Sequence, residues 1–341
     1  MKILGSIIKD SKQGGPGSWG INKWHTENIK YFPPKIDFFK DYKKLIEDEF
    51  LTKIDIKSKL TISSPVLTIG SCFARELRFF LNEAGLNSSN FIIPSGLNNS
   101  FAIRDFVYWV VNGKTSNIAY GYDTNIDGKI VEWTPSEELE SYRNYFKKCE
   151  CFVFTLGLSE VWEEKKTKKV FWRGVPEKIF EKNQFDFRLT TVEENKNNIV
   201  EIVKLIKSIN KQTKIFITLS PVPLKGTFFN HSCITSDCIS KSTLRVAISE
   251  SLKEFKDSNN IFYFPSFEIV KWIGPYLNLP VYGAEDGSSR HVSRYIVINI
   301  INLFVRNFFD ETSNKRFNKY LSNLGLQDIS KSFILKGSTK D

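Results

Sequence analysis

The sequence predicts an α/β protein in which helices cover both faces of a parallel sheet. Short apolar runs alternate along the chain with longer segments whose apolar residues recur at helical spacing. The apolar runs are continuous rather than interrupted at every second position, as expected for strands that are buried on both faces. Each run ends in a turn signal. These observations favour a doubly wound, three-layer arrangement.

The first strand and helix are predicted from residues 66–85. The run VLTIG (66–70) is short, apolar and β-branched, which indicates a buried strand, and Gly70 ends it. The segment that follows is predicted to be a helix because its apolar residues fall on one face, and Gly85 supplies a C-terminal stop. The residues of that face are Phe73, Leu77, Phe80, Leu81 and Ala84.

The same order of strand, turn and helix recurs to about residue 309. The further predicted strands are FIIP (91–94), CFVFTL (151–156), KIFITLS (215–220) and IFYFPS (261–266). Helices are predicted near 100–113, 240–255, 267–274 and 291–309. Residues 113–135 and 163–190 interrupt this pattern and are predicted to be irregular or hairpin decorations.

The organisation predicted from these elements has three parts. Residues 1–60 form an N-terminal extension that packs on the core and contains one amphipathic helix over 38–51. Residues 61–310 form the α/β domain. Residues 311–341 form a polar C-terminal tail with one short amphipathic segment, FNKYLSNLGL.

Composition limits the classes of function. The formal net charge is +10 and the sequence pI is about 9.2, which suits either an anionic partner or a lysine-rich solvated surface. No nucleic-acid-binding motif is visible, so nucleic acid is not an expected partner. No run of about 18 apolar residues predicts a membrane span, and no secretory signal is evident. Five cysteines is an odd number, which favours a reducing cytoplasm over a disulfide scaffold.

Ser71 is the leading candidate for a nucleophile. In parallel sheets ligands bind beyond the carboxyl ends of the strands, and Ser71 follows the first strand and opens a helix. Helix-start N–H groups would stabilise an oxyanion there. A serine needs a neighbouring base, and the sequence holds three histidines: His25, His231 and His291. His291 with Asp286 could complete a triad in the order Ser, Asp, His, and Glu285 is a second nearby carboxylate.

Each of these residues has a plainer interpretation. Ser71 could be only an N-cap, which is the commonest role of a serine before a helix. Cys72 is a rival nucleophile, because a helix start favours thiolate formation. Its plainer interpretation is a small buried hydrophobic residue. His25 lies in a tryptophan-rich loop and is expected to be structural.

Weaker candidates lie in the other loops after strands. Asn98 and Asn99 could donate side-chain hydrogen bonds to an oxyanion, or could be turn residues. Glu160 could be a buried acid or a charge at a helix start. A zinc site is disfavoured because the spacing of its possible ligands matches no strong pattern; they are His231, Cys233 and Cys238. No phosphate-binding glycine loop is present.

Six segments, taken in order, resemble the family named for its Gly-Ser-Cys-Phe-Ala motif, the GSCFA family. They are LTIGSCFARELRFFL, PSGLNNSFAIRDFVYW, FTLGLSEVW, ITLSPVPL with His231 and SKSTLR, YFPSFEIV, and EDGSSRHVS. Together they cover about residues 65–300. That family in turn resembles the SGNH hydrolases and bacterial enzymes of polysaccharide acylation.

The resemblance implies a flavodoxin-like fold, with Ser71 as nucleophile and His291 as base. It places Gly96 and Asn98 or Asn99 near the oxyanion. In the third block the SGNH pattern is Gly-x-Asn, whereas Gly157-Leu158-Ser159 offers Ser159 in place of the asparagine. Further candidate binding residues are Gly157, Ser159, Glu160 and His231. Asp286 stands five residues before His291 instead of three, so Glu285, or a dyad without an acid, stays open.

The function expected from this resemblance is acyl transfer. Ser71 would attack an ester or thioester, and the backbone N–H groups of Ser71 and Gly96, with an asparagine amide, would hold the oxyanion. The acceptor would be water or a sugar hydroxyl of a bacterial polysaccharide or glycan precursor. No cofactor is required, and acyl-CoA is a candidate donor. The alternative is a non-catalytic module that binds a glycan or a CoA-like ligand in the same pocket.

Overall fold

The structure is a computed structural model. The residues that it describes are 32–33, 37–38, 41–52, 54–87, 93–94, 96–116, 118–120, 122–124, 130–132, 138–277, 280–283 and 287–325. The chain divides into two compact units, residues 1–45 and residues 46–341. The predicted division fell after residue 60, whereas the structure assigns residues 46–60 to the α/β unit. There the backbone at Leu60 forms a parallel bridge with Phe309.

The centre of the α/β unit is a four-stranded, all-parallel sheet in the order β1-β5-β9-β10. The strands are β1 (Val66–Gly70), β5 (Cys151–Leu156), β9 (Lys214–Leu219) and β10 (Ile261–Phe264). Almost every residue of these strands is buried, which is why their sequences read as unbroken apolar runs. The strands end level with one another, because Gly70 pairs with Thr155 and Thr155 pairs with Thr218.

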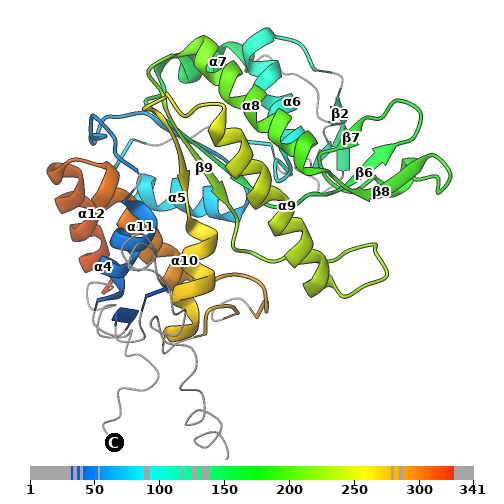
Figure 1. Ribbon diagram of the computed structural model, residues 1–341. Helices are drawn as coiled ribbons and strands as arrows, with labels where there is room; N and C mark the ends of the chain where they lie inside the picture. The colour runs from blue at the N-terminus through cyan, green and yellow to red at the C-terminus, as the bar shows by residue number, and fades with distance from the viewer. Residues whose placement is uncertain are drawn as a thin grey trace, which may run out of the picture. The chain divides into compact units, whose positions relative to one another are not determined.

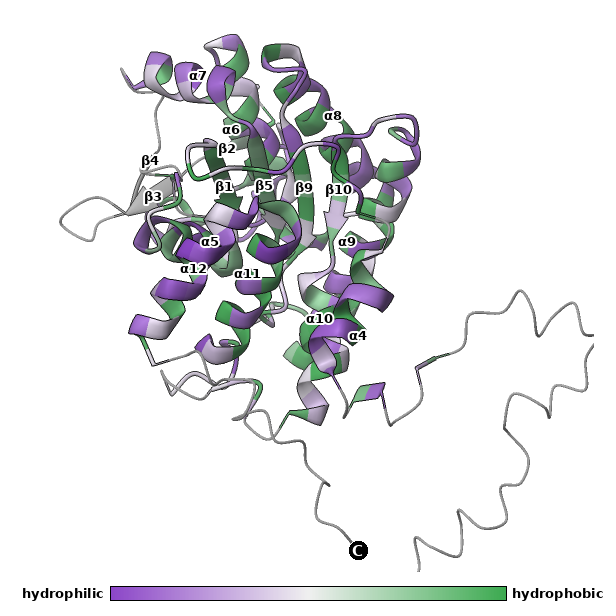
Figure 2. Cartoon of the chain, turned by 90° about the vertical axis from the view of Figure 1, so that its left-hand side faces the viewer, coloured by the Kyte–Doolittle hydropathy of each residue, from purple (hydrophilic) through white to green (hydrophobic). Residues whose placement is uncertain are grey.

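Helices cover both faces of this sheet, as the sequence predicts. One side carries α5 (Cys72–Glu83), α11 (Arg294–Phe308) and α12 (Glu311–Asn323) (Figure 2). The other carries α6 (Ser100–Asn112), α7 (Leu139–Lys148), α8 (Val192–Ile209) and α9 (Cys233–Lys253) (Figure 1). The remaining helical segments are α4 (Tyr42–Ile46), a π-helix (Glu47–Leu51), α10 (Ser266–Ile273), and single 3₁₀ turns at Glu177–Ile179 and Gly274–Tyr276.

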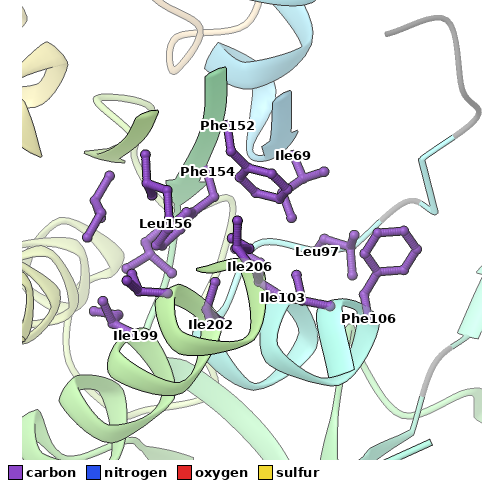
Figure 3. Close-up of a cluster of buried hydrophobic side chains, with 14 of the residues drawn as sticks. Ile69, Leu97, Ile103, Phe106, Phe152, Phe154, Leu156, Ile199, Ile202 and Ile206 are labelled. Atoms are coloured by element: carbon purple, nitrogen blue, oxygen red, sulfur yellow. The ribbon is translucent and has the colours of Figure 1, made fainter. Parts of the chain in front are cut away.

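Alternate residues of the strands build two separate cores. Figure 3 shows the first, in which Ile69, Phe152 and Phe154 meet isoleucines of α8 and α6. On the opposite face the ring of Phe216 packs against Phe304 and Phe308 of α11 at centroid distances of 5.1 and 4.8 Å. Burial of this apolar area on both faces is the main stabilisation of the layered arrangement.

The two predicted decorations come together as a second sheet. It has the order β2-β7-β6-β8, built from β2 (Ala119–Tyr120), β7 (Val170–Phe171), β6 (Glu160–Glu164) and β8 (Phe185–Leu189). A separate antiparallel pair joins β3 (Tyr122–Thr124) to β4 (Ile130–Glu132). The second sheet matters for the site because it carries Arg173, just after β7, beside the loop that holds Gly96.

Two expectations about single elements need correction. The predicted strand FIIP is not found where it can be checked, since Ile93 and Pro94 are not in a strand and residues 91–92 lie outside the described residues. The predicted helix over 38–51 is a short α-helix followed by a π-helix. The amphipathic segment expected in the polar tail belongs to α12, which buries Phe317 and Leu321. No helix in the described part of the chain combines the length and apolarity needed to cross a bilayer.

Candidate active site

Ser71 lies at a sharp bend between β1 and α5. The bend depends on Gly70, whose φ is +116°, a conformation that disfavours any residue with a Cβ. A Cβ at Gly70 would also lie 2.2 Å from the backbone oxygen of Thr155 on the neighbouring strand. The chain therefore leaves the sheet at residue 70, and Ser71 is placed beyond the carboxyl end of β1, as predicted.

The hydroxyl of Ser71 does not cap α5. Ser71 is the N-cap residue by position, but its side chain makes no capping hydrogen bond. The residue is only 8% exposed, and its side-chain oxygen is buried without a hydrogen-bond partner. A buried unsatisfied hydroxyl costs stability, so its presence calls for another explanation than capping. The purely structural interpretation of Ser71 loses its main support.

Ser71 opens into a cavity of about 240 Å³ at the end of the sheet. The cavity brings two predicted site residues, Gly96 and Asn98, beside Ser71. Its described lining is completed by Thr68, Ile69, Gly70, Cys72, Ala74, Arg75, Arg78, Ile93, Pro94 and Arg173. The end of β1 thus borders a hollow in the structure.

His291 lines a second cavity that adjoins the first. This hollow of about 130 Å³ shares Cys72 and Arg75 with the Ser71 cavity, and His291 stands on its wall. The backbone oxygen of His291 accepts a hydrogen bond from Gly283 at 2.9 Å, which fixes this residue just before α11. Ser71 and His291 are therefore brought to neighbouring cavities, and the serine hydroxyl is not hydrogen-bonded to the imidazole.

The predicted acids, Asp286 and Glu285, lie outside the described residues. The structure does show a carboxylate in the His291 cavity that sequence reasoning missed. Glu76 lines this cavity, and its side chain forms ion pairs with Arg294 and Arg75 at 3.5 and 3.6 Å. Glu76 stands one helical turn after Cys72 on α5, and this spacing was the available signal.

The structure separates the two asparagines that sequence reasoning treated together. Asn99 is the N-cap of α6: its side-chain oxygen accepts from the Ala102 N–H at 2.8 Å, and its amide donates to Trp172 at 3.2 Å. It is 2% exposed and fully occupied by these bonds. Asn98 lines the Ser71 cavity, and no side-chain hydrogen bond engages it within the described residues. Asn98 is the asparagine that can face a ligand.

Two backbone donors expected at the oxyanion position differ in availability. The Ser71 N–H is already donated to the backbone oxygen of Thr155 at 3.2 Å, which contradicts its expected role. The Gly96 N–H has no hydrogen-bond acceptor among the described residues. Gly157 lies against Ser71, since a Cβ on Gly157 would be 3.5 Å from the Ser71 Cβ, but its N–H donates to the Asn98 backbone oxygen at 2.7 Å.

Ser159 and Glu160 stand apart from the cavities. Ser159 is completely buried, and its N–H and hydroxyl bind Ser240 of α9 at 2.8 and 3.1 Å. Glu160 is the first residue of strand β6 and pairs with Leu189, so it is not at the start of a helix. Its side chain is 6% exposed, with one carboxylate oxygen that has no hydrogen-bond partner. Neither residue lines the two cavities.

His231 is also away from both cavities. Its ring stacks on Phe229 at a centroid distance of 5.4 Å and an interplanar angle of 10°, on an exposed loop before α9. No group of three histidine, cysteine or acidic side chains gathers into a metal-binding arrangement in the described part of the chain. The possible zinc ligands near His231 therefore do not meet in one site.

Lys241 is a second residue that sequence reasoning missed. It lies on α9, is 2% exposed, and donates a hydrogen bond from Nζ to the backbone oxygen of Gly157. Burial lowers the pKa of Lys241 to about 8. The carboxylate of Asp237, 3.9 Å away, has a smaller opposite effect on this pKa. The Cys72 thiol is close enough to influence this pKa as well. A buried cation therefore stands directly behind the loop that faces Ser71.

Comparison with known proteins places these features in a family. No curated protein matches the chain in sequence. A solved structure of a family two carbohydrate esterase from Cellvibrio japonicus resembles it, with 13% sequence identity and a TM-score of 0.33. The match covers 78% of this chain and 64% of that one, so the chain spans a little under two thirds of that structure. The sequence model of the GSCFA family matches residues 65–304. This range holds Ser71 and His291, and the chain belongs to the GSCFA family.

Proposed function

We propose that the protein is an SGNH-like serine acyl-transfer enzyme with a flavodoxin-like core. The observation that carries the proposal is the buried hydroxyl of Ser71, which makes no hydrogen bond and belongs to a residue that lines a cavity at the end of a parallel sheet. An unsatisfied hydroxyl at this position is poised to bond with a ligand rather than with the protein. The reaction is ester hydrolysis or O-acyl transfer, and the substrate class is a bacterial polysaccharide or glycan precursor.

In the first half of the reaction the Ser71 oxygen forms a bond to the acyl carbon. His291 takes the serine proton and then gives it to the departing alcohol or thiol, so that an acyl-serine remains. This step requires the imidazole to reach across the shared wall at Cys72 once substrate is bound, as catalytic hydrogen bonds often tighten only in the substrate complex. Acyl-CoA is one candidate donor for this half-reaction.

Asn98 and the Gly96 N–H are assigned to the oxyanion. Both lie on the wall of the Ser71 cavity, and neither donor is occupied by another described residue. In the second half, water or a sugar hydroxyl attacks the acyl carbon, its proton passes to His291, and the Ser71 oxygen leaves with that proton. An acid such as Asp286, Glu285 or Glu76 would orient His291.

The test is turnover of 4-nitrophenyl acetate by the wild-type protein and by Ser71→Ala. We expect the variant to lose turnover while its thermal unfolding transition stays in place. Ser266→Ala is the matched control, because Ser266 also follows a strand, β10, and begins a helix, α10. Its hydroxyl is bound to the Leu219 backbone oxygen at 2.9 Å and takes no part in the cavity. Equal turnover in Ser71→Ala and wild type would exclude the proposal.

The alternative, a binding module without catalysis, is favoured by the absence of a hydrogen bond between Ser71 and His291. A fluorophosphonate probe separates the two functions because it reacts only with an activated serine. Labelling of Ser71, located by mass spectrometry, supports the enzyme. If the folded protein is not labelled and hydrolyses no ester, the binding module is the better description.

A further inference from the structure

Three arginines line the cavity into which Ser71 opens. Arg75 and Arg78 come from α5, and Arg173 comes from the segment after β7, almost a hundred positions further along the chain. No acidic side chain is among the described residues that line this cavity. The described lining of the cavity therefore carries an excess of positive charge.

Among the described residues these arginines have few polar partners. Arg78 and Arg173 make no hydrogen bond or ion pair there. Arg75 makes one loose ion pair with Glu76 at 3.6 Å, and its side chain is 66% exposed. Burial lowers the pKa of the Arg78 guanidinium, and the positive charge of Arg75 lowers it further. Cations that repel one another at a cavity wall are stabilised when an anion binds between them.

Arg173 is held next to the candidate oxyanion position. Gly96 has a φ of +91°, and a Cβ placed on it would lie 2.3 Å from the Cγ of Arg173. The stem of Arg173 thus occupies the space that the absent Gly96 side chain leaves open. This close packing fixes the Arg173 side chain on the cavity wall, beside the backbone that is assigned to the oxyanion.

We infer that Arg75, Arg78 and Arg173 form an anion subsite beside Ser71, which binds a carboxylate or phosphate group of the substrate. The inference rests on the proposed function and adds a substrate class to it: an ester or thioester that carries negative charge near the reacting carbonyl. Guanidinium groups bind carboxylate and phosphate oxygens through paired N–H donors, so three of them would orient as well as attract the anion. Ser71 lines the same cavity, so a molecule held this way lies next to it.

The first experiment measures anion binding and needs no turnover. Isothermal titration of the full-length Ser71→Ala protein with inorganic phosphate and with glucuronate, and with glucose as the neutral probe, tests the subsite directly. We expect both anions to bind and glucose not to bind. Arg78→Gln and Arg173→Gln, each added to Ser71→Ala, should weaken anion binding by about tenfold or more.

The matched control is Arg306→Gln. Arg306 is an exposed arginine of α11 that pairs with Glu47 and does not line the cavity, so its loss changes the net charge by the same amount. Anion binding should be unchanged in this variant. The subsite is overturned if phosphate and glucuronate fail to bind, or if they bind equally well to the Arg78, Arg173 and Arg306 variants.

The second experiment identifies which anionic group the substrate carries near its ester. One pair of substrates is an acetylated glucose phosphate and the matching acetylated glucose, which differ in a phosphate on the sugar that bears the ester. The other pair is an acetylated glucuronide and the matching acetylated glucoside, which differ in a sugar carboxylate. The charged member of one pair should have a kcat/KM at least about tenfold higher, and Arg78→Gln should remove that preference.

The two proposals fail in different ways. If the protein hydrolyses no ester but the arginine variants lose anion binding, the subsite is supported and the enzymatic function is contradicted. If turnover depends on Ser71 but neither charged substrate is preferred, the enzymatic function is supported and the subsite is contradicted.

Discussion

The buried ammonium group of Lys241 donates a hydrogen bond to the backbone oxygen of Gly157, the residue that faces the side chain of Ser71. This contact joins the middle of α9 to the loop after β5. Through that loop it supports Asn98, whose backbone oxygen accepts the Gly157 N–H at 2.7 Å. One wall of the Ser71 cavity thus depends on a cation that is almost completely removed from water.

The burial of Lys241 predicts a specific dependence of stability on pH. Its pKa is lowered to about 8 in the folded protein and returns to about 10.5 on unfolding. Between these values the unfolded chain binds one more proton than the folded chain, so this group makes the folded state more stable as pH rises. Below pH 8 both states are protonated and the slope vanishes.

The measurement is urea unfolding from pH 7 to 10.5 for the wild type and Lys241→Met. The free energy of unfolding of the wild type relative to the variant should increase by about 1.4 kcal/mol per pH unit across the window. Lys207, whose pKa burial also lowers to about 8, is present in both proteins and cancels in the difference. Exposed Lys253, changed to Met, should show no such slope, and a flat difference for Lys241→Met would contradict the assignment.

Gly70→Ala should be strongly destabilising. The added Cβ would meet the Thr155 backbone oxygen at 2.2 Å, and the φ of +116° is strained for any other residue. Together the strain and the clash with a central strand should cost about 3 kcal/mol or more. Thermal unfolding measures this cost. Gly226→Ala is the control, because a Cβ at Gly226 meets nothing within 4 Å, and it should leave the unfolding temperature unchanged.

The neighbouring residues Asn98 and Asn99 should give opposite results when each is changed to alanine. Asn99→Ala removes the N-cap of α6 and should lower the free energy of unfolding by about 1 to 2 kcal/mol. Asn98→Ala removes no side-chain hydrogen bond of the described structure, so stability should hardly change. If Asn98 holds the oxyanion, its loss should reduce kcat by about 10²- to 10³-fold. Unfolding curves and ester kinetics on the same two proteins check both statements.

Cys72 should be open to alkylation without being needed for turnover. It is partly exposed and lines both cavities, whereas Cys149 and Cys151 are buried and burial raises the pKa of both thiols. Iodoacetamide should therefore modify Cys72 in the native protein, along with Cys233 and exposed Cys238, but not Cys149 or Cys151. Peptide mass mapping before and after unfolding reports this pattern.

Activity separates a nucleophile from a wall residue at position 72. The alkylated wild type should lose ester turnover because the new group occupies space in the cavities that Cys72 lines. Cys72→Ala should keep turnover and resist iodoacetamide. Loss of turnover in Cys72→Ala, with Ser71→Ala still active, would instead make the thiol the nucleophile.

The layered core could be predicted from the sequence because its signals are local. The runs at 66–70, 151–156, 215–219 and 261–264 are apolar on both faces, and such runs have few places to be buried except the middle of a sheet. The bend at Gly70 and the place of Ser71 follow from the same local signals. Residues 91–94 carried an equally apolar signal, but Ile93 and Pro94 are not in a strand, since proline cannot donate to a strand ladder.

The composition of the site was decided by tertiary packing. The roles of Arg173 and Lys241 depend on tertiary contacts. The second sheet brings Arg173 to the cavity that Ser71 lines, and the buried face of α9 brings Lys241 to Gly157. The difference between Asn98 and Asn99 has the same origin, because the Asn99 side-chain amide donates a hydrogen bond to the backbone oxygen of Trp172, which follows β7 of the second sheet. Sequence alone set the strands, the bend and the serine, because each depends on a few adjacent residues. Which charges surround that serine depends on contacts between residues far apart in the chain, and only the folded arrangement fixes those.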